Sequence, residues 1–134
     1  MKQVAKLIII DQNDNYLLMK RSDHPTFPND PDLPGGTLEE GEEPLETMLR
    51  EVTEEAGVTV NPQEVKHVYT GANYSHHGTV YHLYTTRVNE RPEIIISWEH
   101  DSYDWMSKEE FLARVGGAAD TYMQMVHDII GQKS

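Results

Sequence analysis

The sequence predicts an α/β domain in which a mixed β-sheet is packed between helices. Three observations predict it: β-branched and apolar segments open the chain, an amphipathic helix and further strands follow, and helical segments end it. A length of 134 residues suits a single domain over residues 1–134 with a sizeable core.

The first half of the chain predicts a hairpin, a loop and a helix. Residues 4–11 are β-rich, residues 16–20 are apolar, and the segment Asp-Gln-Asn-Asp-Asn at residues 11–15 is dense in turn formers. Residues 23–34 contain four prolines, which predicts a loop because proline interrupts helices. Residues 44–56 are the clearest helix, since their apolar residues recur every three or four positions and Gly57 suits the C-terminal cap.

The second half predicts more strands and two helices. The expected strands are residues 58–60, 65–74, 79–88, 93–97 and 102–106. A helix begins at the capping box of Ser107 and Glu110 and is broken at Gly116 and Gly117. A last amphipathic helix runs from about residue 119 to 130.

Charge and composition exclude several classes of protein. The 23 acids outnumber the 11 bases, for a formal net charge of −12, which disfavours binding to nucleic acid and to anionic membranes. Cysteine is absent, which excludes disulfides, thiolate zinc sites and cysteine nucleophiles. The longest aliphatic run has four residues, and no signal-peptide pattern opens the sequence, so we expect a cytoplasmic protein.

The helix at residues 44–56 carries an unusual acidic face. Residues 36–58 hold eight glutamates and a single base, Arg50. Glu51, Glu54 and Glu55 share one face, away from the apolar stripe, and repel one another. Taken alone they fit a solvated acidic surface, but a bound Mg²⁺ would relieve the repulsion, because this ion takes carboxylate and phosphate oxygens.

The spacing around these glutamates matches a known motif. Residues 36–58 fit the pattern G-x5-E-x7-R-E-U-x-E-E-x-G-U, with U aliphatic, at every defined position. This segment resembles the Nudix box, and Leu33-Pro34-Gly35-Gly36 resembles the usual approach to it. The resemblance implies an α/β/α sandwich with a mixed sheet. It also implies metal-dependent hydrolysis of a nucleoside diphosphate linked to another group.

The resemblance also assigns roles within the motif. By resemblance, the ligands of Mg²⁺ or Mn²⁺ are the carboxylates of Glu51, Glu54 and Glu55 and the carbonyl oxygen of Gly35. The implied catalytic residues are Glu51, Glu54 and Arg50. Glu51 is the first choice as general base, although the base varies between branches of the family. Arg50 and Glu42 are expected to form an ion pair that orients the loop and the helix.

Further candidates lie outside the motif. Glu99 is the best candidate for an additional metal-binding carboxylate, with Asp101 as the alternative and a solvated loop acid as the plain interpretation. Arg21 suits a substrate phosphate or is a surface arginine. Tyr74 and Tyr84 suit stacking on a base or are rim or core aromatics.

We expect the protein to bind a small nucleotide and to bind neither nucleic acid nor a membrane. The sequence leaves open whether it forms a homodimer. The leading substrate is a nucleoside triphosphate, cleaved to monophosphate and pyrophosphate. A dinucleoside polyphosphate or a nucleotide sugar is the alternative. A nucleotide-binding regulator without turnover is the alternative from another class, and the complete glutamate set argues against it.

Overall fold

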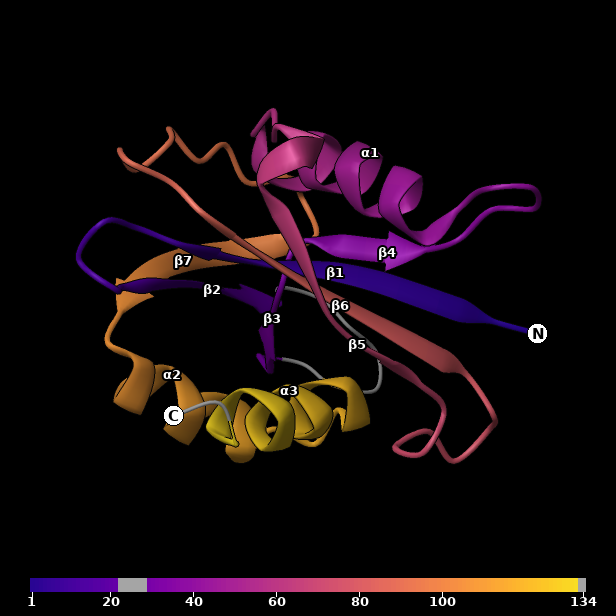
Figure 1. Ribbon diagram of the computed structural model, residues 1–134. Coiled ribbons are helices and arrows are strands. Elements are labelled where there is room, and N and C mark those ends of the chain that lie inside the picture. Colours follow the sequence, from indigo (N-terminus) through magenta and orange to yellow (C-terminus); the bar gives the residue numbers. More distant parts are fainter. Residues whose placement is uncertain (22–28, 133–134) are drawn as a thin grey trace.

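A mixed sheet built around β1 (Gln3–Ile10) forms the centre of this computed structural model, which describes residues 1–21 and 29–132 (Figure 1). β1 pairs in parallel with β6 (Val80–Arg87) along its whole length. β6 in turn pairs antiparallel with β5 (Val65–Gly71), which lies at the end of the sheet. Parallel and antiparallel pairs therefore share one sheet, which confirms the predicted fold class.

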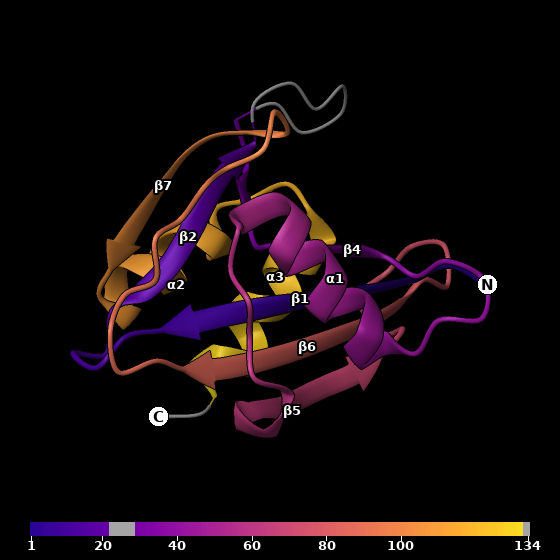
Figure 2. The same ribbon diagram turned by 90° about the horizontal axis from the view of Figure 1, so that it is seen from above.

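On the other side of β1 the sheet divides. The predicted hairpin joins β1 to β2 (Tyr16–Arg21), but the two strands are in register only where Ile10 faces Tyr16. β2 then diverges from β1 and pairs with β3 (Pro31–Asp32) and β7 (His100–Met106). Figure 2 shows β2 beside β7 and turned away from β1. The short strand β4 (Gly35–Thr37) instead pairs with the first half of β1. This divergence separates β2 from the first half of β1.

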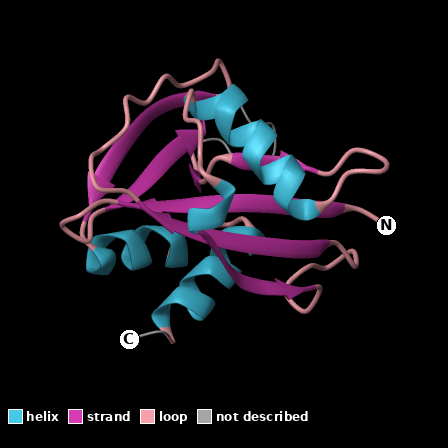
Figure 3. Ribbon diagram, turned by 45° about the horizontal axis from the view of Figure 1, so that its top comes forward, coloured by secondary structure: helices cyan, strands magenta, loops and turns pink. Residues whose placement is uncertain are grey.

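Helices cover both faces of the sheet. α1 (Pro44–Ala56) lies on one face, and α2 (Lys108–Gly116) and α3 (Thr121–Gly131) lie on the other (Figure 3). The arrangement is the expected α/β/α sandwich. Within residues 1–21 and 29–132, none of the helices has the length and apolar character needed to span a bilayer.

Two apolar cores follow from the alternation of side chains along β1. Ala5, Leu7 and Ile9 pack with α1, while Ile8 and Ile10 pack with α2 and α3. Lys6 has the parity of Ile8, so its ammonium group lies on the α3 side, 5.4 Å from the centre of the Tyr122 ring. The strand thus places one lysine on an otherwise apolar face.

Local capping explains where the helices begin and end. Gly57, with φ of 70°, ends α1 by donating its N–H to the carbonyl of Thr53. The Ser107 side chain accepts from the backbone N–H of Glu110, as the capping-box pattern predicts for α2. Asp120 caps α3, so this helix begins at Thr121, two residues later than predicted.

Some predicted boundaries are wrong. Residues 58–60 and 93–97 form no strand. Instead, the N–H of Ile95 donates to the carbonyl of Ala56 at 2.8 Å, so residues 93–97 satisfy the exposed end of α1 rather than the sheet. β5 ends at Gly71, and β7 begins two residues earlier than predicted. The predicted loop at residues 23–34 includes β3, and residues 23–28 lie outside the described residues.

Candidate active site

A cavity of about 940 Å³ lies where β2 diverges from β1. Its wall is formed by the first half of β1, β4, one face of α1, the loop before β7 and the start of α3. Carboxylates from α1 and from the loop lie on one side, and a group of buried charged residues from the sheet lies beside them. This volume is typical of sites that hold a nucleotide-sized ligand.

The acidic wall is formed by Glu51, Glu55 and Glu99. Glu55 is only 6% exposed, and burial raises the pKa of its carboxyl to about 9, with a further contribution from its hydrogen bond to Glu51 and from nearby acids. At neutral pH Glu55 therefore keeps its proton. The proton of Glu55 reduces the repulsion between Glu55 and Glu51. A metal cation bound between the two carboxylates would reduce that repulsion in the same way.

Two glycines bring the backbone of β4 close to this wall. A side-chain carbon at Gly36 would lie 2.7 Å from the carboxyl carbon of Glu51. At Gly35, where φ is 146°, it would lie 2.2 Å from the carbonyl oxygen of Ala5. Any larger residue would push β4 away from β1 or from α1. The absence of side chains here lets the backbone pass between the central strand and Glu51.

Arg50 ties the acidic helix to the preceding loop. Its guanidinium contacts both carboxylate oxygens of Glu42 at 3.0 Å, as the expected ion pair requires. It also contacts Glu51 at 3.0 Å and Glu54 at 3.3 Å. The Glu54 side chain is 57% exposed and does not line the cavity. Arg50 thus compensates the carboxylates that the sequence places together on α1.

Replacing Arg50 by Gln should raise the pKa of Glu42. In the wild-type protein, the hydrogen bonds that the Glu42 carboxylate accepts from Arg50 and from the backbone of Glu39 lower the pKa of Glu42 to about 2. Because the pKa of Glu42 is lower in the folded protein than in the unfolded chain, the ionised Glu42 carboxylate stabilises the folded state above pH 4.5, the ordinary pKa of this carboxyl in the unfolded chain. This contribution to stability is lost as the pH falls toward 2. An NMR pH titration of the Glu42 carboxyl in both proteins measures the shift. An unchanged Glu42 pKa in the Arg50→Gln variant would show that the ion pair with Arg50 is not what lowers it.

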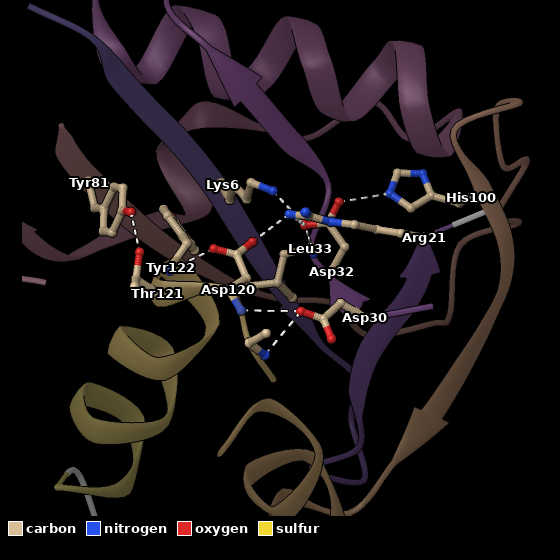
Figure 4. Close-up of polar contacts among 11 residues, drawn as sticks. Lys6, Arg21, Asp30, Asp32, Leu33, Tyr81, His100, Asp120, Thr121 and Tyr122 are labelled. Atoms are coloured by element: carbon tan, nitrogen blue, oxygen red, sulfur yellow. Dashed lines mark hydrogen bonds and ion pairs between the residues drawn. The ribbon is translucent and has the colours of Figure 1, made fainter. Parts of the chain in front are cut away.

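Beside the acidic wall lies a buried cluster, which we call the Asp32 cluster and which Figure 4 shows. Its members are Lys6, Arg21, Asp32, His100 and Asp120. Asp32 pairs with Lys6, Arg21 and His100, and Asp120 receives a 2.6 Å contact from Arg21. Burial alone would raise the pKa of Asp32, but the charge of Lys6, the hydrogen bond to His100 and the charge of Arg21 hold it far below its ordinary value.

The five members of the Asp32 cluster come from five separate parts of the chain, with Asp32 itself in β3. Lys6 comes from β1, Arg21 from β2, His100 from β7, and Asp120 from the cap of α3. Of these five residues, only Arg21 is among the candidates predicted from the sequence. A lysine within an apolar strand is a sequence signal for Lys6, whereas nothing local marks His100 or Asp120 as its neighbours.

The structure brings together some of the other candidate residues and separates the rest. Gly35, Glu99 and Arg21 line the cavity with Glu51 and Glu55, whereas Asp101 does not. Tyr84 is buried in the core beneath α1. The hydroxyl of Tyr74 donates to Asp128 at 3.0 Å on α3. Neither tyrosine lines the cavity, so the structure does not place them for stacking on a ligand there.

The donors of the acidic wall suit a hard divalent cation. Within the described parts of the chain, no three His, Asp or Glu side chains converge on one metal position. Arg50 contacts both Glu51 and Glu54, at 3.0 and 3.3 Å. Carboxylate and carbonyl oxygens are nevertheless the ligands that Mg²⁺ prefers, and those of Glu51, Glu55 and Gly35 meet at this wall.

Comparison with known proteins identifies the family. A family model described as the NUDIX domain matches residues 1–125. The chain belongs to the Nudix family. Over 57 residues it is 35% identical to an 8-oxo-dGTP diphosphatase of Escherichia coli (strain K12), covering 42% of this chain and 44% of that protein. Over 55 residues it is 40% identical to a Bacillus subtilis (strain 168) protein provisionally assigned the same activity, covering 41% of this chain and 34% of that protein.

The match thus spans less than half the length of these curated Nudix relatives. Solved structures are similar in fold over nearly the whole of this chain. The MutT protein from Methanosarcina mazei Go1 superposes with a TM-score of 0.71 at 21% identity, over 98% of this chain and 93% of that chain. The NUDIX domain of Shewanella oneidensis NrtR, complexed with ADP-ribose, gives 0.73 at 20% identity, over 98% and 88%. A C. elegans Ap4A hydrolase gives 0.66 at 17% identity, over 98% and 99%.

Proposed function

We propose that this Nudix protein is a divalent-metal-dependent pyrophosphohydrolase that cleaves a nucleoside triphosphate to the monophosphate and pyrophosphate. The observation that carries the proposal is the meeting of Glu51, Glu55 and Glu99 on one wall of a nucleotide-sized cavity. Buried cations from the Asp32 cluster lie in the same cavity. Anionic oxygens for a metal and cations for phosphate are the two requirements of phosphoanhydride hydrolysis.

Glu51, Glu55 and Glu99, with the carbonyl oxygen of Gly35, would hold Mg²⁺ or Mn²⁺. The bound cation would neutralise the pyrophosphate and lower the pKa of a water molecule. We assign the role of general base to Glu51, whose carboxylate lies at the cavity. The 3.0 Å contact with Arg50 would fix the position of that carboxylate. Arg50 acts as a positioning residue, since it joins Glu51 to the loop of Glu42 without lining the cavity.

Lys6 and Arg21 are the cations that the Asp32 cluster contributes to the cavity wall, where they pair with Asp32 and Asp120. Lys6 and Arg21 are held at fixed positions by Asp32 and Asp120, so their charges face an arriving phosphate without the cost of ordering long side chains. Arg21 is the residue that we propose to contact substrate phosphate.

The names of the curated relatives support a nucleoside triphosphate as substrate, since both are described as acting on 8-oxo-dGTP. The solved structures keep the alternative class open, because one is an Ap4A hydrolase and another is bound to ADP-ribose. All of them share the fold, and in such folds the residues outside the common motif decide which group is accepted.

The test is a phosphate-release screen. The purified protein is incubated with Mg²⁺ or Mn²⁺ and with canonical and oxidised nucleoside triphosphates, dinucleoside polyphosphates, nucleotide sugars and ADP-ribose, with pyrophosphatase or phosphatase as coupling enzyme. We expect metal-dependent release of pyrophosphate from triphosphates. Turnover of another class on the panel would correct the substrate. Nucleotide binding by calorimetry without turnover of any compound would favour a regulator.

A further inference from the structure

The loop between β5 and β6 forms one wall of the cavity, next to the N-terminal end of β1 (Figure 1). It spans residues 72–79, and it contributes Ser75, His76, His77 and Thr79 to the cavity lining. Both histidines are exposed. Two exposed imidazoles on a cavity wall are groups that a bound nucleotide can contact by hydrogen bonds. The position of this loop therefore bears on how a ligand fits the cavity.

Ser75 organises the tip of the loop. Its hydroxyl oxygen accepts from the backbone N–H groups of His77 at 3.1 Å and of Thr79 at 3.0 Å. Its own backbone N–H donates to the carbonyl of Ala72 at 3.3 Å, which closes a turn. These bonds fix the shape of the loop, but all of them lie within it. They do not determine where the loop lies relative to the rest of the molecule.

Tyr74 fastens the loop to α3. Its hydroxyl donates to Oδ2 of Asp128 at 3.0 Å, across 54 positions in sequence. Its ring packs against the core and meets the Tyr69 ring edge-on, with the ring centres 6.1 Å apart. The same helix begins at Thr121, which lines the cavity together with Asp120. The bond between Tyr74 and Asp128 thus joins two separate elements of the cavity wall.

The ionisation states of the two partners favour this bond at neutral pH. Hydrogen bonds from His127 and from Tyr74 lower the pKa of the Asp128 carboxyl, which is therefore ionised. Burial and the hydrogen bond to Asp128 raise the pKa of Tyr74, so its hydroxyl keeps its proton and remains the donor. A hydrogen bond to a charged acceptor is about twice as strong as one between neutral groups.

We propose that the hydrogen bond between Tyr74 and Asp128 is a latch that holds the loop against α3, and that Tyr74 is a positioning residue for substrate binding. This inference rests on the proposed function, which places a nucleotide in the cavity. A latched loop presents His76 and His77 at fixed positions, so a ligand that contacts them does not have to order the loop as it binds. An unlatched loop adds that cost to binding, while the reacting groups stay as they are.

Removing the hydroxyl of Tyr74 tests the latch by kinetics. Tyr74→Phe should raise the KM for dGTP about three- to tenfold, as expected for the loss of one hydrogen bond, with little change in kcat. Asp128→Ala should have the same effect, whereas Asp128→Asn keeps an acceptor oxygen and should behave as wild type. The double variant Tyr74→Phe/Asp128→Ala should be no worse than either single variant, because both remove one shared bond. Tyr103→Phe is the matched control, since Tyr103 lies on β7, is 38% exposed and does not line this cavity.

Backbone dynamics test the latch without turnover. In ¹⁵N relaxation measurements, the order parameters of the His77 and Thr79 amides should fall in Tyr74→Phe from about 0.85 to about 0.6 or less. The turn at residues 11–15 is an internal control, because the Asp11 carboxylate accepts backbone N–H groups two and four positions further along the chain and organises that turn in the same way. The order parameters of the control turn should be equal in the two proteins.

The outcomes separate the latch from the proposed function. An unchanged KM in Tyr74→Phe, an equal rise in Tyr103→Phe, or order parameters that do not fall would overturn the latch and leave the hydrolase standing. Effects of Tyr74→Phe and Asp128→Ala that add in the double variant would also overturn the latch. If the protein turns over no triphosphate, the hydrolase is contradicted. In that case a fall in the order parameters, together with weaker binding of dGMP with Mg²⁺ by calorimetry, would support the latch, and unchanged order parameters would overturn it.

Discussion

Replacing Glu55 by Gln is expected to lower kcat/KM for the triphosphate by about a hundredfold or more, with the fold intact. The amide cannot bind a divalent cation as a carboxylate does, and loss of one preorganised charge at the reacting centre costs about 10²–10³ in rate. The substitution conserves volume at a site that is 6% exposed, and it replaces a carboxyl that is already protonated in the metal-free protein. Circular dichroism and steady-state kinetics with Mg²⁺ measure both results.

Thermal unfolding with and without Mg²⁺ separates the metal from the fold. A cation that binds only the folded chain stabilises it in proportion to the logarithm of its concentration, so Mg²⁺ should raise the Tm of the wild-type protein. The Tm of Glu55→Gln should respond far less. Glu109→Gln, an exposed residue on α2, is the matched control and should behave as wild type. Full activity of Glu55→Gln with Mg²⁺ would show that the ligand assignment is wrong.

Replacing Asp32 by Asn is expected to have the largest effect on stability, about 3–5 kcal/mol of the free energy of unfolding at pH 7. Asp32 is the common partner of Lys6, Arg21 and His100 in a buried site. Its removal takes away the carboxylate that pairs with both Lys6 and Arg21, while Asp120 still pairs with Arg21. Urea denaturation of both proteins measures the difference.

The effect of Asp32→Asn depends on pH in a defined direction. The pKa of Asp32 is far below its ordinary value in the folded protein, so its ionised form stabilises the fold above the unfolded pKa of about 3.9. This stabilisation is lost as pH falls below that value, and the gap between wild type and variant should narrow. Asp101→Asn removes the same charge from an exposed position and should change stability little. If the difference in free energy of unfolding between wild type and Asp32→Asn stayed constant from pH 7 to pH 3, the ionised form of Asp32 would not be the source of the stabilisation.

Much of the fold could be read from local patterns. The helix at residues 44–56, its glycine cap and the Ser107 cap of α2 all depend on neighbours within four residues, and all three are present. The hairpin between β1 and β2 follows from the turn-forming segment between them. The spacing of Glu51, Glu54 and Glu55 on one helix is likewise a local property. Local hydrogen bonds and the helical repeat determine these features, so the order of residues suffices to predict them.

Only the tertiary structure decided which of these groups meet. The acidic face of α1 is divided by its surroundings, since Glu55 is buried against the cavity while Glu54 points to solvent and pairs with Arg50. Residues 93–97 are apolar enough for a strand, yet they bond to the end of α1, where unpaired carbonyls were available. The members of the Asp32 cluster meet across long separations in sequence. Such contacts depend on how the strands diverge and the helices pack, which no local pattern in the chain specifies.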